Sequence, residues 1–214
     1  MEDQRRIEIL LQLMGDRYGV KRGKTTELED PFHTLVSCIL SHRTRDQNSR
    51  EASKRLFEAA ENPVEVLKMP HDELKERIRC SGFYNQKARN IRAICKALKE
   101  EHQGRVPKDR GELLSLRGVG PKTADIVLSR AFGRPAIPVD VHVSTVAKRL
   151  GFVEEGAGPE RVKEVLESLV PSGDYGFLDD VFVKHGKELC RSRNPRCGEC
   201  FVRHHCSYPD PQTR

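Results

Sequence analysis

The sequence contains no long hydrophobic run. Only 36% of its 214 residues are hydrophobic, and no stretch reaches the length of about 18 apolar residues that a membrane-spanning helix needs. The first 20 residues carry charges of both signs and lack the basic start, apolar centre and small-residue cleavage site of a signal peptide. We therefore expect no membrane partner and a protein that stays inside the cell, where thiols are mostly reduced.

The alternating pattern that is typical of β-strands is also absent. Apolar residues recur instead at helical spacing, for example over 5–18, 121–132 and 140–150. The second of these segments begins with a proline and is followed by a glycine, and the third begins with an aspartate, a residue that favours helix N-termini. Sequence repeats and low-complexity tracts are missing as well. The sequence therefore predicts an all-α fold with short loops.

The charge balance is only mildly basic. The chain has 38 lysines and arginines against 32 aspartates and glutamates, which gives a formal net charge of +6. Such a balance favours a polyanionic partner, but a basic protein without any such partner has the same composition. The charge alone therefore does not decide the class of partner.

Seven cysteines need an explanation in a reducing compartment. Three of them fall within helical patterns, where we expect small buried side chains: Cys38, Cys80 and Cys95. The other four lie close together in CRSRNPRCGECFVRHHC, at a C-x6-C-x2-C-x5-C spacing: Cys190, Cys197, Cys200 and Cys206. Four thiolates this close indicate a metal centre rather than disulfides.

Two kinds of metal centre fit these four cysteines. Zinc accepts four thiolates, but its usual sites contain two C-x2-C pairs, and this loop contains one. A [4Fe–4S] cluster also takes four thiolates and tolerates irregular spacing. The spacing favours iron–sulfur and leaves zinc open.

The loop that carries these cysteines is basic. Arg191, Arg193 and Arg196 lie between the first two cysteines. A metal centre would hold their guanidinium groups in a fixed loop, where phosphates would meet preorganised donors. The alternative is an ordinary run of solvated charges.

The segment LRGVGPKTADIVL predicts a tight turn between two helices. Gly118, Val119 and Gly120 would expose backbone N–H groups next to the N-terminus of the following helix, an arrangement that binds anions. A helix-hairpin-helix of this kind holds a DNA phosphate without reading the base sequence. A single G-x-G also occurs in many ordinary turns, so the pattern gains weight only from its position between two helices.

Two polar residues in this part of the chain are candidates for chemistry. Lys122 follows the turn, and a neutral lysine amine can attack an electrophilic sugar carbon and form a Schiff base. Asp140, in VDVHV, can stabilise positive charge on a sugar or take a proton from the lysine. The alternatives are a surface charge beside a phosphate for Lys122 and a simple helix cap for Asp140.

Together, LRGVGPKTADIVL, VDVHV and the four-cysteine loop resemble the endonuclease III family of helix-hairpin-helix DNA glycosylases. The similarity extends over about residues 5–208 and includes GFYNQKARNI and GRVPKDRGELLSL. The resemblance implies two α-helical lobes with the active site in the cleft between them. One lobe, over 24–135, would be a six-helix barrel with the hairpin. The other, over 1–23 and 136–214, would carry a [4Fe–4S] cluster.

The resemblance also implies an activity. The protein would be a bifunctional base-excision-repair enzyme that removes oxidised pyrimidines from damaged double-stranded DNA and nicks the strand by β-elimination. Lys122 would be the nucleophile, Asp140 the essential carboxylate, and the four clustered cysteines the iron ligands. We expect a monomer, in the cytoplasm or on the nucleoid, or in the nucleus of a eukaryote.

Several positions depart from the pattern of the family. Arg43 stands where the family has a Gln that fills the gap left by a flipped base, and Phe83 stands where it has a Leu. Phe83 fits an intercalating wedge. His42, Asp46 and His142 are possible pocket residues, with helix-end or capping roles as the alternative. These departures leave open a shifted specificity, such as uracil or thymine opposite guanine.

A different class of protein remains open from the residues alone. A non-catalytic DNA-binding module could use the same hairpin, basic loop and a structural metal. Lys122 and Asp140 distinguish the two, because a binding module needs no paired amine and carboxylate.

Overall fold

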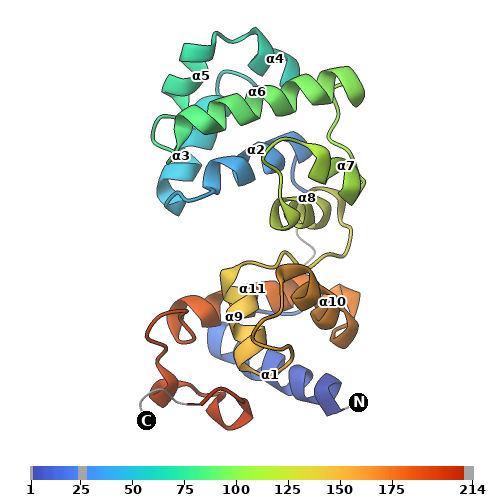
Figure 1. Cartoon of the computed structure of the whole chain (residues 1–214), viewed down its shortest axis with the longest axis vertical. Coiled ribbons are helices and arrows are strands. Elements are labelled where there is room, and N and C mark those ends of the chain that lie inside the picture. Colours follow the sequence, from blue (N-terminus) through green and yellow to red (C-terminus); the bar gives the residue numbers. More distant parts are fainter. Residues whose placement is uncertain (1, 24–27, 210–214) are drawn as a thin grey trace. The chain divides into compact units, whose positions relative to one another are not determined.

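The computed structural model of the chain describes residues 2–23 and 28–209. Within these residues the only regular elements are α-helices and short 3-10 helices, so the predicted all-α fold is confirmed. Contacts divide the chain into two compact units (Figure 1). The first joins Met1–Thr26 to Pro135–Arg214, and the second is Glu27–Arg134. No helix in the described ranges is long and apolar enough to cross a membrane.

The helices have the following bounds. The second unit contains α2 (Pro31–Ser41), α3 (Asp46–Phe57), α4 (Pro63–Lys68), α5 (His71–Arg77), α6 (Tyr84–Glu101), α7 (Arg110–Ser115) and α8 (Pro121–Phe132). The first unit contains α1 (Glu2–Tyr18), α9 (Val141–Arg149), α10 (Pro159–Leu169) and α11 (Tyr175–Glu188). It also contains three 3-10 turns: η1 (Ser172–Asp174), η2 (Cys197–Glu199) and η3 (Arg203–His205). The helices predicted over 5–18, 121–132 and 140–150 correspond to α1, α8 and α9.

The second unit is built around α2, which packs against α3, α6 and α8 (Figure 1). Asp30 caps its first turn by accepting a hydrogen bond of 2.8 Å from the backbone N–H of His33, and Pro31 follows at the first helical position. Its large apolar residues form one broad face, and Leu35, Val36 and Leu40 have no exposed surface. Each side chain of this kind contributes about 2 kcal/mol through burial. Because α2 is central, its C-terminal end is placed precisely against α6 and α8.

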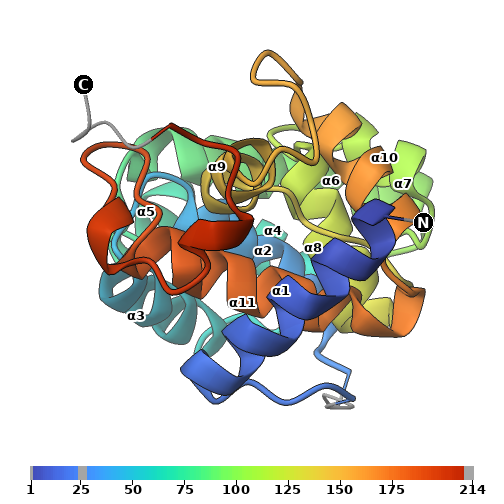
Figure 2. The same cartoon turned by 90° about the horizontal axis from the view of Figure 1, so that it is seen from below.

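The first unit has its own core between α1 and α11, which lie side by side (Figure 2). The apolar residues at helical spacing in 5–18 form a buried stripe on α1: Ile7, Leu10, Leu11 and Met14. At Gly15 the two helices come so close that a Cβ would lie 2.6 Å from the Phe177 ring. A glycine therefore sets the distance between α1 and the helix that precedes the four-cysteine loop.

An ion pair with a buried carboxylate joins α7 to α8. The carboxylate of Asp125 is 2% exposed and accepts hydrogen bonds of 2.9 and 3.2 Å from the guanidinium of Arg110. This pair fixes the helix that follows the G-x-G turn against the helix that precedes it. Removing Asp125 would take both of these charge-assisted hydrogen bonds from Arg110.

We predict that Asp125→Ala lowers the free energy of unfolding by about 2 kcal/mol, because two hydrogen bonds between charged groups are lost. Urea denaturation measures the change. Glu164→Ala is the control, since Glu164 pairs with Arg161 on the exposed surface of α10 and its loss changes stability by about 0.5 kcal/mol or less. Equal changes in the free energy of unfolding for the two substitutions would contradict the claim that the Arg110–Asp125 pair stabilises the fold more than a surface pair does.

Candidate functional site

The predicted hairpin is present between α7 and α8. Its turn closes with a hydrogen bond of 3.0 Å from the Val119 N–H to the Leu116 carbonyl, and Gly120 is the N-cap of α8. Gly118 has a φ of +83° and lies against α6, where a Cβ would be 2.5 Å from Nδ2 of Asn90. Only glycine meets both conditions at this position. Gly118 is exposed and Val119 is buried, so the turn is anchored by its middle residue.

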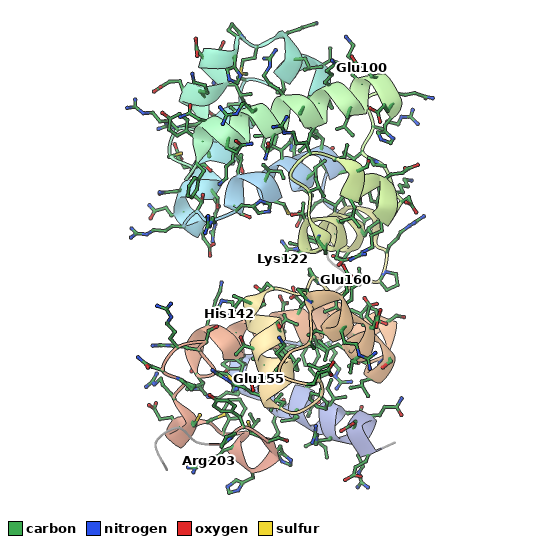
Figure 3. The ribbon with its side chains drawn as sticks, viewed as in Figure 1. Glu100, Lys122, His142, Glu155, Glu160 and Arg203 are labelled. Carbon is green, nitrogen blue, oxygen red and sulfur yellow. The ribbon has the colours of Figure 1, made fainter. Side chains whose placement is uncertain are left out.

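Lys122 is the second residue of α8 and is exposed (Figure 3). The next residue, Thr123, points inward, and its hydroxyl lies 3.1 Å from Nε2 of His42 at the end of α2. Burial, followed by the positive charges of Lys87 and Lys122, lowers the pKa of His42. A neutral imidazole therefore connects the end of α2 to the first turn of α8, and His42, predicted as a pocket residue, lies beside Lys122.

Two exposed side chains predicted to act on DNA are brought together by separate turns. Arg43 follows α2 and Phe83 precedes α6, and the Arg43 guanidinium lies 5.5 Å from the centre of the Phe83 ring. The Phe83 side chain is 64% exposed, which is unusual for so large an apolar group. Both residues have a positive φ, of 50° and 58°. This conformation costs about 1 kcal/mol or more for a residue other than glycine, and it is common at functional sites.

Asp140 lies in the first unit as the N-cap of α9. Its Oδ1 accepts hydrogen bonds of 2.8 and 2.9 Å from the backbone N–H groups of His142 and Val143. The capping reading of Asp140 is therefore correct, and the bonds fix the orientation of a carboxylate that is partly exposed.

The other two possible pocket residues have different surroundings. His142, on α9, packs against α11 so closely that a Cβ at Gly186 would lie 2.7 Å from its Cβ (Figure 3). Its buried Nδ1 has no hydrogen-bond partner among the described residues. Asp46 is exposed at the first position of α3.

The four clustered cysteines line one cavity of about 250 Å³ in the first unit. The rest of its wall combines apolar side chains, including Leu150, Leu189 and Val202, with polar ones, among them three arginines: Arg149, Arg196 and Arg203. In residues 2–23 and 28–209 no three His, Cys, Asp or Glu side chains are placed to share a single metal ion, whereas a [4Fe–4S] cluster takes its four thiolates on separate irons. Four thiols around one cavity are the donor set that a [4Fe–4S] cluster takes, so these residues fit that group.

Two residues that the sequence did not single out touch the sulfur atoms. Arg149, at the end of α9, donates to the carbonyl of Arg191 at 2.7 Å and approaches Sγ of Cys190 at 3.5 Å. His185 places Nε2 3.7 Å from Sγ of Cys200 and Nδ1 3.0 Å from the Tyr18 hydroxyl. Burial lowers the pKa of His185 to about 4, so the imidazole is neutral.

The tautomer of His185 follows from the state of Cys200. A thiolate has no proton to donate, so with Cys200 in that state Nε2 donates to the sulfur and the Tyr18 hydroxyl donates to Nδ1. Burial raises the pKa of the free Cys200 thiol to about 11, and a bound metal reverses this preference because it deprotonates a coordinating thiol.

The basic residues of the loop do not all share one environment. Arg196 makes a two-pronged ion pair with Glu199, three residues further on. Arg191 and Arg193 are exposed. The expected set of phosphate donors therefore divides into one arginine that already has a carboxylate partner and two that face solvent.

Comparison with known proteins gives two family matches. Residues 36–172 match the model of the HhH-GPD superfamily base excision DNA repair protein, and residues 190–206 match the iron-sulfur binding domain of endonuclease III. The second match begins at Cys190 and ends at Cys206.

Individual relatives agree with the family models. Endonuclease III from Thermotoga maritima is 44% identical over 179 residues, which is 84% of each chain. A solved structure of a trapped endonuclease III–DNA covalent intermediate is 35% identical, covers 99% of each chain and has a TM-score of 0.87. The structure of a thermostable thymine-DNA glycosylase is 25% identical, covers 95% of this chain and 96% of its own, and has a TM-score of 0.83.

The two family matches agree with two features of the helical structure: the hairpin between α7 and α8, and the cavity lined by the four cysteines. The chain has the fold of a base excision repair DNA glycosylase and AP lyase, binds DNA, and carries the domain that holds a [4Fe–4S] cluster. The chain belongs to the endonuclease III family of the HhH-GPD superfamily.

Proposed function

We propose that the protein removes oxidised pyrimidines from duplex DNA with Lys122 as a Schiff-base nucleophile and then nicks the strand by β-elimination. The observation that carries the proposal is the position of Lys122, exposed on the first turn of α8 directly after the G-x-G turn. A hairpin of this kind holds a phosphate of the DNA backbone, so a lysine beside it is close to a sugar.

The chemistry needs one amine and one carboxylate. The Lys122 amine attacks C1′ of the damaged nucleotide, and the bond from C1′ to the base breaks with its electron pair going to the base. The amine then loses a proton, and opening of the sugar ring gives the Schiff base. Removal of a C2′ proton expels the 3′ phosphate. We propose that Asp140, oriented by its two capping bonds, accepts the amine proton and stabilises positive charge on the sugar.

Extrusion of a nucleotide leaves a gap in the duplex that side chains must fill. We propose that Phe83 enters the base stack and that Arg43 faces the orphaned base or a phosphate. Their proximity of 5.5 Å and the exposure of Phe83 support this assignment, because a large apolar side chain held in water gains burial when it enters a base stack. A monomer suffices for this arrangement, since both turns belong to one unit.

A second candidate specificity is uracil or thymine opposite guanine. Arg43 favours it, because a guanidinium at the gap can donate to the acceptor atoms of an orphaned guanine. The similarity to the thymine-DNA glycosylase structure points the same way. Lys122 favours a lyase in either case.

We propose Cys190, Cys197, Cys200 and Cys206 as the four ligands of the cluster, because together they line one cavity. A bound cluster would cross-link the loop over 190–206. Arg191 and Arg193 would then present their guanidinium groups to phosphates from a fixed backbone, which lowers the ordering cost of binding.

We predict that Lys122→Gln abolishes strand cleavage and borohydride trapping while DNA affinity stays nearly unchanged, because one surface charge beside the hairpin contributes little to the total phosphate contact. The measurements are single-turnover cleavage, trapping and binding on duplexes that carry an oxidised thymine or an abasic site. Lys99→Gln, on the exposed side of α6, is the control. A parallel loss of binding and cleavage would contradict the nucleophile assignment.

Duplexes with uracil or thymine opposite guanine, assayed beside the oxidised thymine, separate the two specificities. Faster excision of the oxidised thymine supports the first proposal, and faster excision of the mismatched base replaces it with the second.

We predict that the purified protein is brown and binds about four iron atoms per chain, as a [4Fe–4S] cluster requires. Cys197→Ser removes one proposed ligand and lowers both the iron content and the visible absorbance. Cys80→Ser is the matched control, since the Cys80 sulfur contacts the Asn48 carbonyl in the other unit. A colourless, zinc-loaded and fully active preparation is the outcome that would overturn the cluster assignment.

A further inference from the structure

The second unit contains a buried lysine that the proposed chemistry does not use. Lys87, in the first turns of α6, is 4% exposed. Its Nζ donates to four oxygens: the carbonyls of Leu40 and His42 at 2.8 and 2.6 Å, and the hydroxyls of Thr44 and Ser81, both at 2.8 Å. An ammonium has three N–H groups, so at least one is shared between two acceptors. All four acceptors are uncharged.

Burying the Lys87 ammonium costs free energy, and filling space in the core does not require a charged group. Burial lowers the pKa of Lys87 to about 8, and the four oxygens oppose that effect because they hydrogen-bond the ammonium form. A methionine would fill a similar volume without the cost of burying a charge. The ammonium therefore does something that an apolar side chain cannot do, which is to hold several oxygens at one point.

The four oxygens belong to two separate turns. Leu40, His42 and Thr44 lie at the end of α2 and in the turn that follows it, whereas Ser81 lies in the turn before α6. The same two turns make further contacts: the Ser81 hydroxyl donates to the Leu40 carbonyl at 2.9 Å, and the Gly82 N–H donates to the Thr44 hydroxyl at 3.0 Å. A Cβ at Gly82 would lie 2.8 Å from the Arg43 carbonyl. Lys87 thus lies at the centre of a junction between the two turns.

The exposed side of this junction carries Arg43 and Phe83. Both residues have a positive φ, a conformation that persists only where the surroundings determine it. Arg43 lies between His42 and Thr44, two of the residues that Lys87 contacts, and Phe83 lies two residues after Ser81. The contacts of Lys87 therefore fix the backbone on both sides of Arg43 and just before Phe83.

We propose that Lys87 is a positioning residue that holds Arg43 and Phe83 ready to enter the gap left by an extruded nucleotide. This inference rests on the proposed gap-filling role of the pair. Lys87 itself does not touch DNA, because its amine is enclosed by the two turns. Its effect is to order both turns before DNA binds, so that the complex does not bear the entropic cost of ordering them.

The test begins with Lys87→Met, which keeps an unbranched side chain one atom shorter and removes all four hydrogen bonds. We expect single-turnover base excision to fall by about tenfold or more, the effect of losing hydrogen bonds to a charged group at a site that must stay ordered. Lys96→Met, at an exposed position of the same helix, is the control. Wild-type excision by a folded Lys87→Met protein would overturn the proposal.

A milder pair of variants covers the case in which Lys87→Met does not fold. Thr44→Val removes one acceptor of Lys87 and the partner of the Gly82 N–H, and Thr44→Ser keeps the hydroxyl. We expect the valine variant to lose several-fold in excision rate and the serine variant to retain most of it. Equal rates for the two variants would contradict the proposal.

A double-mutant cycle separates positioning from a general structural role. Lys87→Met is combined with Arg43→Ala and Phe83→Ala together. If Lys87 acts through the pair, its substitution has almost no further effect on excision once the pair is removed. An equal loss in both backgrounds would show that Lys87 acts elsewhere and would overturn the proposal.

The variant without Arg43 and Phe83 also distinguishes a failure of the gap-filling role from a failure of the positioning role of Lys87. If removing Arg43 and Phe83 leaves excision unchanged, the gap-filling role fails and the positioning role fails with it. If removing the pair slows excision but the Lys87 and Thr44 variants do not, only the positioning role fails. Borohydride trapping on an abasic site reports the Lys122 chemistry independently in every variant.

Discussion

One buried ammonium group, that of Lys87, lies at the centre of the two turns that we propose meet the damaged base. Lys87 draws carbonyl and hydroxyl oxygens from two turns to a single point, and an apolar core residue cannot do this because it has no preferred partners. The turn after α2 also carries His42, whose link to Thr123 connects it to α8 and hence to Lys122. One charge with neutral partners therefore links the segments that carry Lys122, the proposed nucleophile, and the proposed gap-filling residues Arg43 and Phe83.

The first unit places its functional groups by different means. Asp140 is oriented by helix capping, in which two backbone N–H groups hold one carboxylate oxygen. Two of the cysteine sulfurs contact neighbours on α9 and α11: Cys190 contacts Arg149, and Cys200 contacts His185. Such supporting contacts fix metal ligands before the metal arrives and are a large part of the design of a metal site. In both units, hydrogen bonds from neighbouring polar groups thus fix the orientation of the proposed functional residues.

Structural features that depend only on residues close together in the chain could be predicted from the sequence. Helix periodicity, the Asp140 cap and the cysteine spacing are local patterns, and the α1 stripe and the α9 cap agree with the structure. The role of Lys87 was not predictable, because a lysine on an amphipathic helix indicates a solvated face, and its partners lie up to 47 residues away. The contacts of His185 were missed because its partners, Tyr18 and Cys200, also lie outside its own helix. The ion pair of Arg196 could have been predicted from the sequence, since Glu199 is only three residues away.

The central claim is that Lys122 forms the covalent bond to DNA. The most direct test is to trap the wild-type protein on an abasic duplex with borohydride, digest the adduct and identify the modified lysine by mass spectrometry. The account predicts a sugar adduct on Lys122, within the peptide between Arg117 and Arg130. An adduct on another lysine, or no adduct in a protein that still cleaves the strand, would contradict it.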